Sequence, residues 1–319
     1  MSTPLRHAAA LIVALLLGAV PARAEDKPIQ VVIAFPPGGT STACMKPLIE
    51  PMAAALGRPI ELDYRPGAGG NVAAVHVARA APDGSTLLFG HAGPLAINHH
   101  INQRSFFDPA KDFRPLALVV RYPIVVGAAA TTRIRSLADL NKAARDGPVV
   151  VGSSGNGSVQ HLAGEIYRFK ADIPVLLVPF AGGGPLQQAL MRGDLHVLFE
   201  SGSNTVEHIK AGRLRALGVM WPERLATLPD TPTLAEQGFQ DLDVSAWFGL
   251  LAPAATPDDA AARLSDAVLA ALDRPEVRKA LQDIGGLPSP MPPAAFAELI
   301  AAENARWGRV VRDAGIKPD

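Results

Sequence analysis

The sequence lacks three things: cysteine pairs, an excess of charge and long apolar runs beyond its N-terminus. Cys44 is the only cysteine, so an internal disulfide is excluded and packing must hold the fold. No histidine lies near it in the sequence, and we expect Cys44 to be a small apolar residue on a helix. The 30 basic and 30 acidic residues balance, which gives no indication of a nucleic-acid-binding surface.

The N-terminus carries the one apolar run of note. Residues 8–20 are apolar, and small residues follow at Ala22 and Ala24. The run is short for a membrane-spanning helix, and the small residues suit a signal peptidase. We therefore predict that residues 1–24 are a signal peptide, cleaved after Ala24 on export to the periplasm. An uncleaved membrane anchor is the alternative.

The rest of the chain alternates between strand and helix patterns. Short β-branched runs separated by helical periodicity are typical of parallel sheets with crossover helices, so the predicted class is α/β. Strands are predicted over residues 29–35, 59–64, 86–89, 116–127, 149–152, 175–178, 195–199, 214–220 and 244–252. Helices are predicted over residues 40–56, 71–81, 136–145, 158–170, 257–272, 275–284 and 292–311, with one more after the glycine turn at 182–185.

Residues 25–319 are long enough for two domains of roughly 100–150 residues each. The last three predicted helices bring no new strands, which fits a return of the chain to the first domain. We predict a first lobe from residues 25–127 with 241–319 and a second lobe from residues 128–240. Two crossover segments would then form a hinge.

Two loops carry the pattern of an anion site. Residues 36–42 and 153–161 each join a predicted strand to a helix, and both combine glycines with hydroxyl side chains. Helix N-termini present unpaired N–H groups there, and a carboxylate is the natural guest. Taken alone, such a turn is also ordinary structural punctuation. Gln160 adds an adjustable polar group, and His161 would either donate to a ligand or bond a neighbour.

Other chemistry has little support in the sequence. Residues 67–70 are glycine-rich, but their spacing does not match a dinucleotide fingerprint. No histidine spacing matches a zinc site, so neither a metal nor a cofactor is expected. The chain has no Gly-x-Ser-x-Gly or His-Glu-x-x-His motif, so it is not expected to be an enzyme, although a secreted hydrolase is the alternative from another class. Glu200 would accept a ligand hydroxyl or bond backbone N–H groups.

Several motifs together resemble one known family. They are FPPGG at residues 35–39, RPGAGGN at 65–71, APDG at 81–84, DPAKDF at 108–113, SSGNG at 153–157, QHLAGE at 160–165 and WFGLLAP at 247–253. In this order they resemble the tripartite tricarboxylate transporter receptors, also called Bug-type extracytoplasmic solute receptors. The resemblance extends from about Pro28 to the C-terminus.

The resemblance implies a two-lobed, periplasmic-binding-protein-like (type II, Venus flytrap) fold, with a mainly parallel sheet and flanking helices in each lobe. It also implies a receptor that closes on a small mono-, di- or tricarboxylate and delivers it to integral membrane permease subunits. Because it must close about a hinge, such a neutral receptor is most simply a monomer. An alternative partner is a sensor kinase. Residue by residue, it assigns ligand contacts to Phe35, Pro37, Gly38, Gly39, Thr40, Ser41, Ser154, Gly155, Asn156, Ser158 and His161. The predicted ligand-binding set also includes Thr42, His91, Gly183 and Glu200.

Two departures from the family pattern bear on the ligand. Family members often carry Asp where this chain has Thr42, so the first loop is neutral and disfavours an amino acid. Residues 180–184 lack the lysine that the family usually has there, and their added glycines leave more room. The first feature favours a simple or aromatic carboxylate, and the second allows a bulkier ligand.

Overall fold

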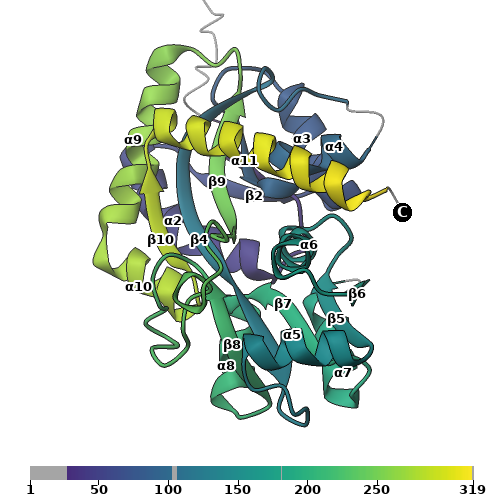
Figure 1. Ribbon diagram of the computed structural model, residues 1–319. Coiled ribbons are helices and arrows are strands. Elements are labelled where there is room, and N and C mark those ends of the chain that lie inside the picture. Colours follow the sequence, from purple (N-terminus) through teal and green to yellow (C-terminus); the bar gives the residue numbers. More distant parts are fainter. Residues whose placement is uncertain (1–26, 103–105, 181, 318–319) are drawn as a thin grey trace, which may run out of the picture.

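The computed structural model describes residues 27–102, 106–180 and 182–317 (Figure 1). The predicted signal peptide lies outside the described residues. Within these ranges, no helix combines the length and the apolar character that a membrane crossing requires.

The first lobe is built on three parallel strands extended by antiparallel ones. Its strands are β1 (Ile29–Ile33), β2 (Ile60–Tyr64), β3 (Thr86–His91), β9 (Ser245–Pro253), β10 (Leu287–Met291) and the first part of β4 (Phe113–Ala129). Strands β2, β1 and β3 are parallel neighbours, β9 runs antiparallel to β3, and β4 runs antiparallel to β9. The helices of this lobe are α2 (Thr40–Leu56), α3 (Asn71–Ala78), α4 (Asn98–Ile101), α9 (Asp258–Asp273), α10 (Pro275–Asp283) and α11 (Pro293–Ala314).

The second lobe repeats this plan with its own parallel core. Its strands are β5 (Val149–Ser154), β6 (Val175–Phe180), β7 (Val197–Ser201), β8 (Leu214–Met220) and the end of β4. Strand β5 pairs in parallel with β6 and β7, whereas β4 pairs antiparallel with β7 and β8. The helices are α5 (Leu137–Asp146), α6 (Val159–Ala171), α7 (Gly183–Arg192) and α8 (Gly202–Lys210). Figure 1 shows α11 of the first lobe lying above α6 of the second.

Strand β4 joins the two lobes. Its residues from Phe113 to Pro123 pair with β9, and its residues from Ile124 onward pair with β7 and β8. The second connection enters β9 beside it, where the N–H of Ile124 donates to the carbonyl of Val244. The α/β, two-lobed fold class is thus confirmed, and the change of partners falls near the predicted boundary at residue 127. The exact division of the chain into lobes stays a proposal.

Three segments differ from the sequence-based expectation. Strand β10 was not predicted because Pro288 and Pro290 argue against a central strand. It pairs only with β4, at a position where a missing N–H is tolerated. Helix α8 and the turn of π-helix at Gly93–Ile97 with α4 were not predicted either, since both are short and follow the preceding strand within two residues.

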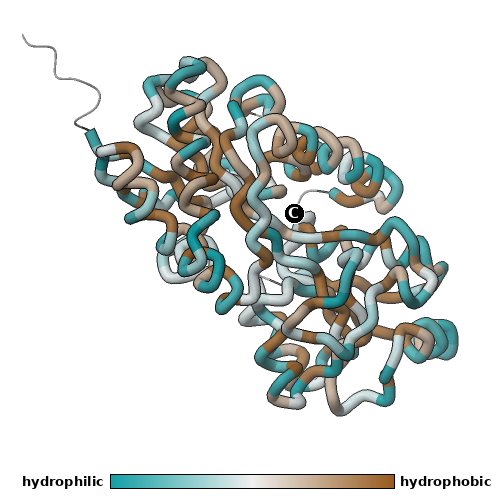
Figure 2. Tube along the Cα trace, turned by 90° about the vertical axis from the view of Figure 1, so that its left-hand side faces the viewer, coloured by the Kyte–Doolittle hydropathy of each residue, from teal (hydrophilic) through white to brown (hydrophobic). Residues whose placement is uncertain are grey.

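Successive side chains along a strand point to opposite faces of the sheet in the first lobe. Val31 and Ile33 pack with α2, α9 and α10, whereas Val32 packs with α3 and α11. In Figure 2 the hydrophobic segments run through the interior of both lobes. Burial of apolar surface, at about 25 cal/mol per Å², is therefore the main stabilising contribution. This agrees with the sequence, in which a single cysteine excludes an internal disulfide.

Cys44 lies in this interior and contacts the shared strand. Its Sγ is 2.8 Å from the hydroxyl of Tyr122 on β4, and burial raises the pKa of the thiol to about 12. The prediction that Cys44 is a packed helix residue is confirmed.

We expect Cys44 to resist thiol reagents in the native protein, because the thiolate is the reactive form. A disulfide reagent at pH 8 should label the native protein at least roughly a hundredfold more slowly than a free thiol. The guanidinium-unfolded chain, as control, should release one equivalent of thiol at once. Complete labelling of the folded protein within minutes would contradict this burial.

A second interior contact ties α11 to β9. The carboxylate of Glu303 accepts hydrogen bonds from the indole N–H groups of Trp247, at 3.2 Å, and Trp307, at 2.8 Å. All three side chains are buried. We expect Glu303→Ala to lower the free energy of unfolding by about 2–4 kcal/mol, since two buried donors lose their acceptor. Glu298→Ala, exposed on the same helix, should stay within about 0.5 kcal/mol of wild type in denaturant titrations followed by tryptophan fluorescence. Equal losses in both variants would argue against the interaction.

Candidate functional site

Four helices begin at the cleft between the lobes. They are α2 from the first lobe and α6, α7 and α8 from the second. Their first residues line two adjoining cavities, of about 490 and 420 Å³. Phe35, Gln160, Ala246 and Phe248 line both cavities and form the boundary between them. Carboxyl ends of strands and amino ends of helices therefore meet at one place, as expected for ligand sites in α/β folds.

Local hydrogen bonds fix the conformation of the loop from β5 to α6. Gly157 adopts φ 65°, and its N–H donates to Nδ1 of His161 at 3.0 Å. Ser158 caps the helix by accepting from the N–H of His161. Within the described chain, the N–H groups of Val159 and Gln160 have no acceptor. The loop thus directs two free donors and the positive end of the helix dipole to the larger cavity.

The loop from β1 to α2 supplies the facing side. Pro36, Pro37, Gly39 and Thr40 line the smaller cavity, and Gly39 is the N-cap of α2. Ser41 lines it too; its hydroxyl is buried and has no hydrogen-bond partner in the described part of the protein. A hydroxyl in this position is a donor available to a bound anion.

Glu200, at the end of β7, organises the second lobe's side of the cleft. Its Oε1 accepts hydrogen bonds from the backbone and hydroxyl of Ser201, from Gln160 at 3.2 Å and from Asn204 at 3.4 Å. Gln160 and Asn204 both line the cavities. Fully buried, Glu200 therefore orients cleft-lining amides from behind the wall.

An aromatic wall closes the first lobe's side of the larger cavity. The ring centroids of Phe35 and His91 lie 4.8 Å apart, and that of Phe248 lies 6.1 Å from Phe35 and 6.2 Å from His91. Nδ1 of His91 accepts from the N–H of Gly93 at 3.2 Å, and burial lowers the pKa of His91 to about 4. The imidazole is consequently neutral near pH 7, with its proton on Nε2.

Most of the predicted site residues line the two cavities. They are Phe35, Pro37, Gly39, Thr40, Ser41, His91, Ser154, Gly155, Asn156, Ser158 and Gly183.

Four predicted residues line neither cavity. Gly38 lines an adjoining groove with residues of α8 and α10, and the hydroxyl of Thr42 donates to Tyr64. His161 lies behind its loop, bonded to Gly157 and 3.8 Å from Glu165, so the structure supports the neighbour-bonded alternative. Glu200 lies behind the wall, as described above.

Sequence reasoning missed the floor of the cleft. Ala246, Trp247 and Phe248 at the start of β9, Tyr122 on β4, and Asn98 line the cavities without having been assigned to the site. The available signal was that the predicted strands 116–127 and 244–252 lie beside the two predicted boundaries between the lobes. Segments that cross between two lobes must pass beneath the ligand.

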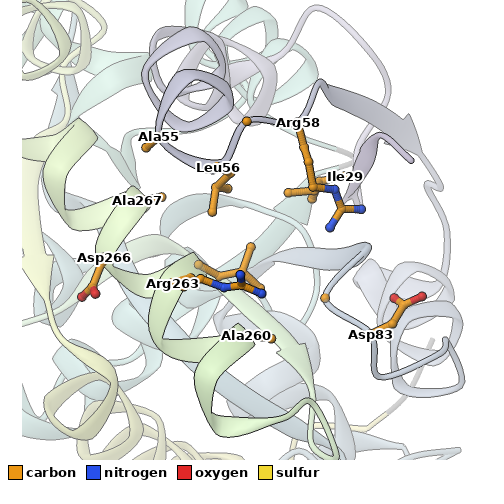
Figure 3. A pocket seen from close by; sticks show the side chains of 12 residues that line it. Ile29, Ala55, Leu56, Arg58, Asp83, Ala260, Arg263, Asp266 and Ala267 are labelled. Carbon is orange, nitrogen blue, oxygen red and sulfur yellow. The ribbon is translucent and has the colours of Figure 1, made fainter. Parts of the chain in front are cut away.

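Another cavity, of about 490 Å³, lies away from the cleft between α2, α9 and the turn at residues 83–84. Figure 3 shows Arg58 and Arg263 reaching into it, while Asp266 points away. Ile29, the first residue of β1, lines it, which places this cavity at the amino ends of the strands. Ligands of α/β sheets bind at the opposite ends, so the cleft is the candidate site. Among the described residues, no three His, Cys, Asp or Glu side chains are grouped to hold a metal ion.

Comparisons with known proteins identify a family profile and relatives that match this chain. The profile described as "Tripartite tricarboxylate transporter family receptor" matches residues 45–316. Protein BugT of Bordetella pertussis is 31% identical over 294 residues, covering 91% of this chain and 90% of BugT.

Two solved structures are similar along nearly their whole length. Rpa4515 of R. palustris with adipate is 30% identical, with a TM-score of 0.82, covering 92% of this chain and 99% of that one. MatC from Rhodopseudomonas palustris with bound malate is 33% identical, with a TM-score of 0.76, covering 89% and 99%. Given these matches and the two-lobed fold with its helix-lined cleft, the chain belongs to the tripartite tricarboxylate transporter receptor family, and it is a Bug-type receptor.

Proposed function

We propose that this protein is a periplasmic receptor that captures a small carboxylate in the cleft and delivers it to the membrane subunits of a tripartite-type transporter. The observation that carries the proposal is the convergence of four helix N-termini on cavities whose described lining contains no Lys, Arg, Asp or Glu. Such a site attracts an anion through backbone dipoles and N–H groups alone.

The donors favour a carboxylate over other anions of similar size. The free N–H groups of Val159 and Gln160 are adjacent in the chain, as a carboxylate with two oxygens requires. Ser41 offers a further hydroxyl from the other lobe. The similar structures with adipate and malate support this ligand class.

Contacts between the lobes support capture by closure. The amide of Asn156 donates to the carbonyl of Lys317, which follows α11, at 3.3 Å. Ile101 packs against Gly157, where an added Cβ would lie 2.3 Å from Cδ1 of Ile101. These contacts fit hinge motion between a lobe of residues 25–127 with 241–319 and a lobe of residues 128–240.

The remaining parts of the proposal concern the role in the cell. We infer export through cleavage after Ala24, action as a monomer, and transient docking to permease subunits. No turnover is proposed: the hydroxyl of Ser158 caps α6, and Nδ1 of His161 accepts from a backbone N–H. Neither side chain is placed as a nucleophile with its base.

The test is a thermal-shift screen followed by titration calorimetry of the mature protein, with adipate, malate and benzoate compared against their uncharged amides. An acid at a hundred times its Kd should raise the melting temperature by roughly 5 °C, because it binds only the folded state. The amides should give no comparable shift. Absence of a shift with every acid would contradict the proposal.

A single variant tests whether one backbone N–H at the N-terminus of α6 contacts the ligand. Val159→Pro removes a backbone N–H at the first position of the helix, where proline is well accepted, and Ser158 already has the extended conformation that precedes proline. We expect it to weaken binding of the bound acid roughly tenfold or more, as a lost bond to a charged group would. Val159→Ala keeps the N–H and is the matched control. Equal affinities of the two variants would show that this N–H does not contact the ligand.

A further inference from the structure

The walls of the larger cavity differ in chemistry. From the first lobe come the rings of Phe35, His91 and Phe248, and from the second come four glycines, at 155, 157, 182 and 183, beside Ser154, Asn156, Ser158, Val159 and Gln160. An aromatic wall that faces glycine backbone forms a slot in which a flat group fits better than a branched one. Glycine at these positions lets the backbone approach the ligand closely.

Phe35 is one of several large apolar side chains that are exposed. It is 38% exposed, and what it faces is the cleft, since it lines both cavities. Its ring is tilted by 40° on His91 and stands edge-on to Phe248, at an interplanar angle of 84°. The part of the ring that these neighbours leave uncovered is apolar surface available for a ligand to cover.

Among the described residues, the aromatic end of the slot offers no cation to a second charge, and the unpartnered Nε2–H of His91 is buried against Gly70. His91 is buried and neutral, and Phe248 is supported from behind by the stacked ring of Phe89, 5.1 Å away. The rest of the described first-lobe lining consists of glycines 69 and 93, Ala92, Ala246, Trp247 and Asn98, whose amide NH₂ already donates to Gly69 and Asn71. A carboxylate placed here would lose its hydration without gaining a cation.

We propose that the ligand is an aromatic monocarboxylate, whose carboxylate binds at the α6 N-terminus and whose ring lies in the slot against Phe35, His91 and Phe248. This inference rests on the proposed carboxylate-receptor function and deepens it by naming the ligand class. The cavity of about 490 Å³ accommodates one substituted ring with its carboxylate.

Three acids separate this proposal from its alternatives. Benzoate and cyclohexanecarboxylate share a carboxylate and a six-membered ring but differ in aromaticity, and adipate replaces the ring by a second carboxylate on an open chain. By calorimetry we expect benzoate to bind roughly tenfold more tightly than cyclohexanecarboxylate, as the gain from aromatic pairing predicts, and more tightly still than adipate.

Phe35→Leu tests the wall itself, since leucine keeps apolar bulk and removes the ring. It should weaken benzoate roughly five- to tenfold and leave cyclohexanecarboxylate within about twofold. Phe169→Leu, a half-exposed phenylalanine on α6 that lines neither cavity, should change neither affinity. Thermal unfolding of each variant verifies that it is folded.

These experiments distinguish failure of the aromatic-ligand proposal from failure of the proposed receptor function. If acids bind but adipate or cyclohexanecarboxylate binds as tightly as benzoate, or if Phe35→Leu affects all acids equally, the aromatic proposal is wrong and the receptor function stands. If no acid binds the wild-type protein, both fall.

Discussion

The geometry of the cleft depends on β4, a single strand shared by two sheets. Its first part is hydrogen-bonded to β9 and its last part to β7 and β8, so the two sheets cannot be placed independently. Almost every residue from Leu116 to Ala129 is buried, so a slip by one residue would move apolar side chains to the wrong face. Because register and burial fix the strand, the loops that follow the parallel strands of both lobes converge on one cleft.

In this arrangement the proposed anion site has no cationic side chains among its described lining. A buried arginine or lysine in the cleft would require a partner charge whenever the cleft is empty. Helix N-termini impose no such requirement, because their N–H groups are fixed by the helices that carry them. The buried carboxylate of Glu200 is held by donors from Ser201, Gln160 and Asn204, and it orients neutral amides that line the cavities.

Local signals in the sequence predicted the fold class and the two loops, because glycines and capping hydroxyls act within a few residues of where they stand. The role of His161 could not be settled in this way, since it depends on the turn that brings the N–H of Gly157 to its Nδ1. Phe248 was missed for a different reason. It reaches the site through the register of β9, which places it opposite His91, and no local pattern encodes a pairing over that separation. Strand β10 was not predicted because it contains prolines. The fold tolerates them because β10 pairs with β4 on one side only.

In the proposed function, the division of candidate binding groups between the lobes links recognition to release. The free N–H groups of Val159 and Gln160 belong to the second lobe, whereas the aromatic wall and Ser41 belong to the first. A ligand held by one lobe alone keeps only part of these contacts, so its affinity depends on the population of the closed state. The cross-lobe contacts of Asn156 and Ile101 contribute to that population without touching the free donors of α6. A partner that pulls these contacts apart would therefore lower the affinity without competing for the ligand's own groups, which is the property that delivery to a transporter requires.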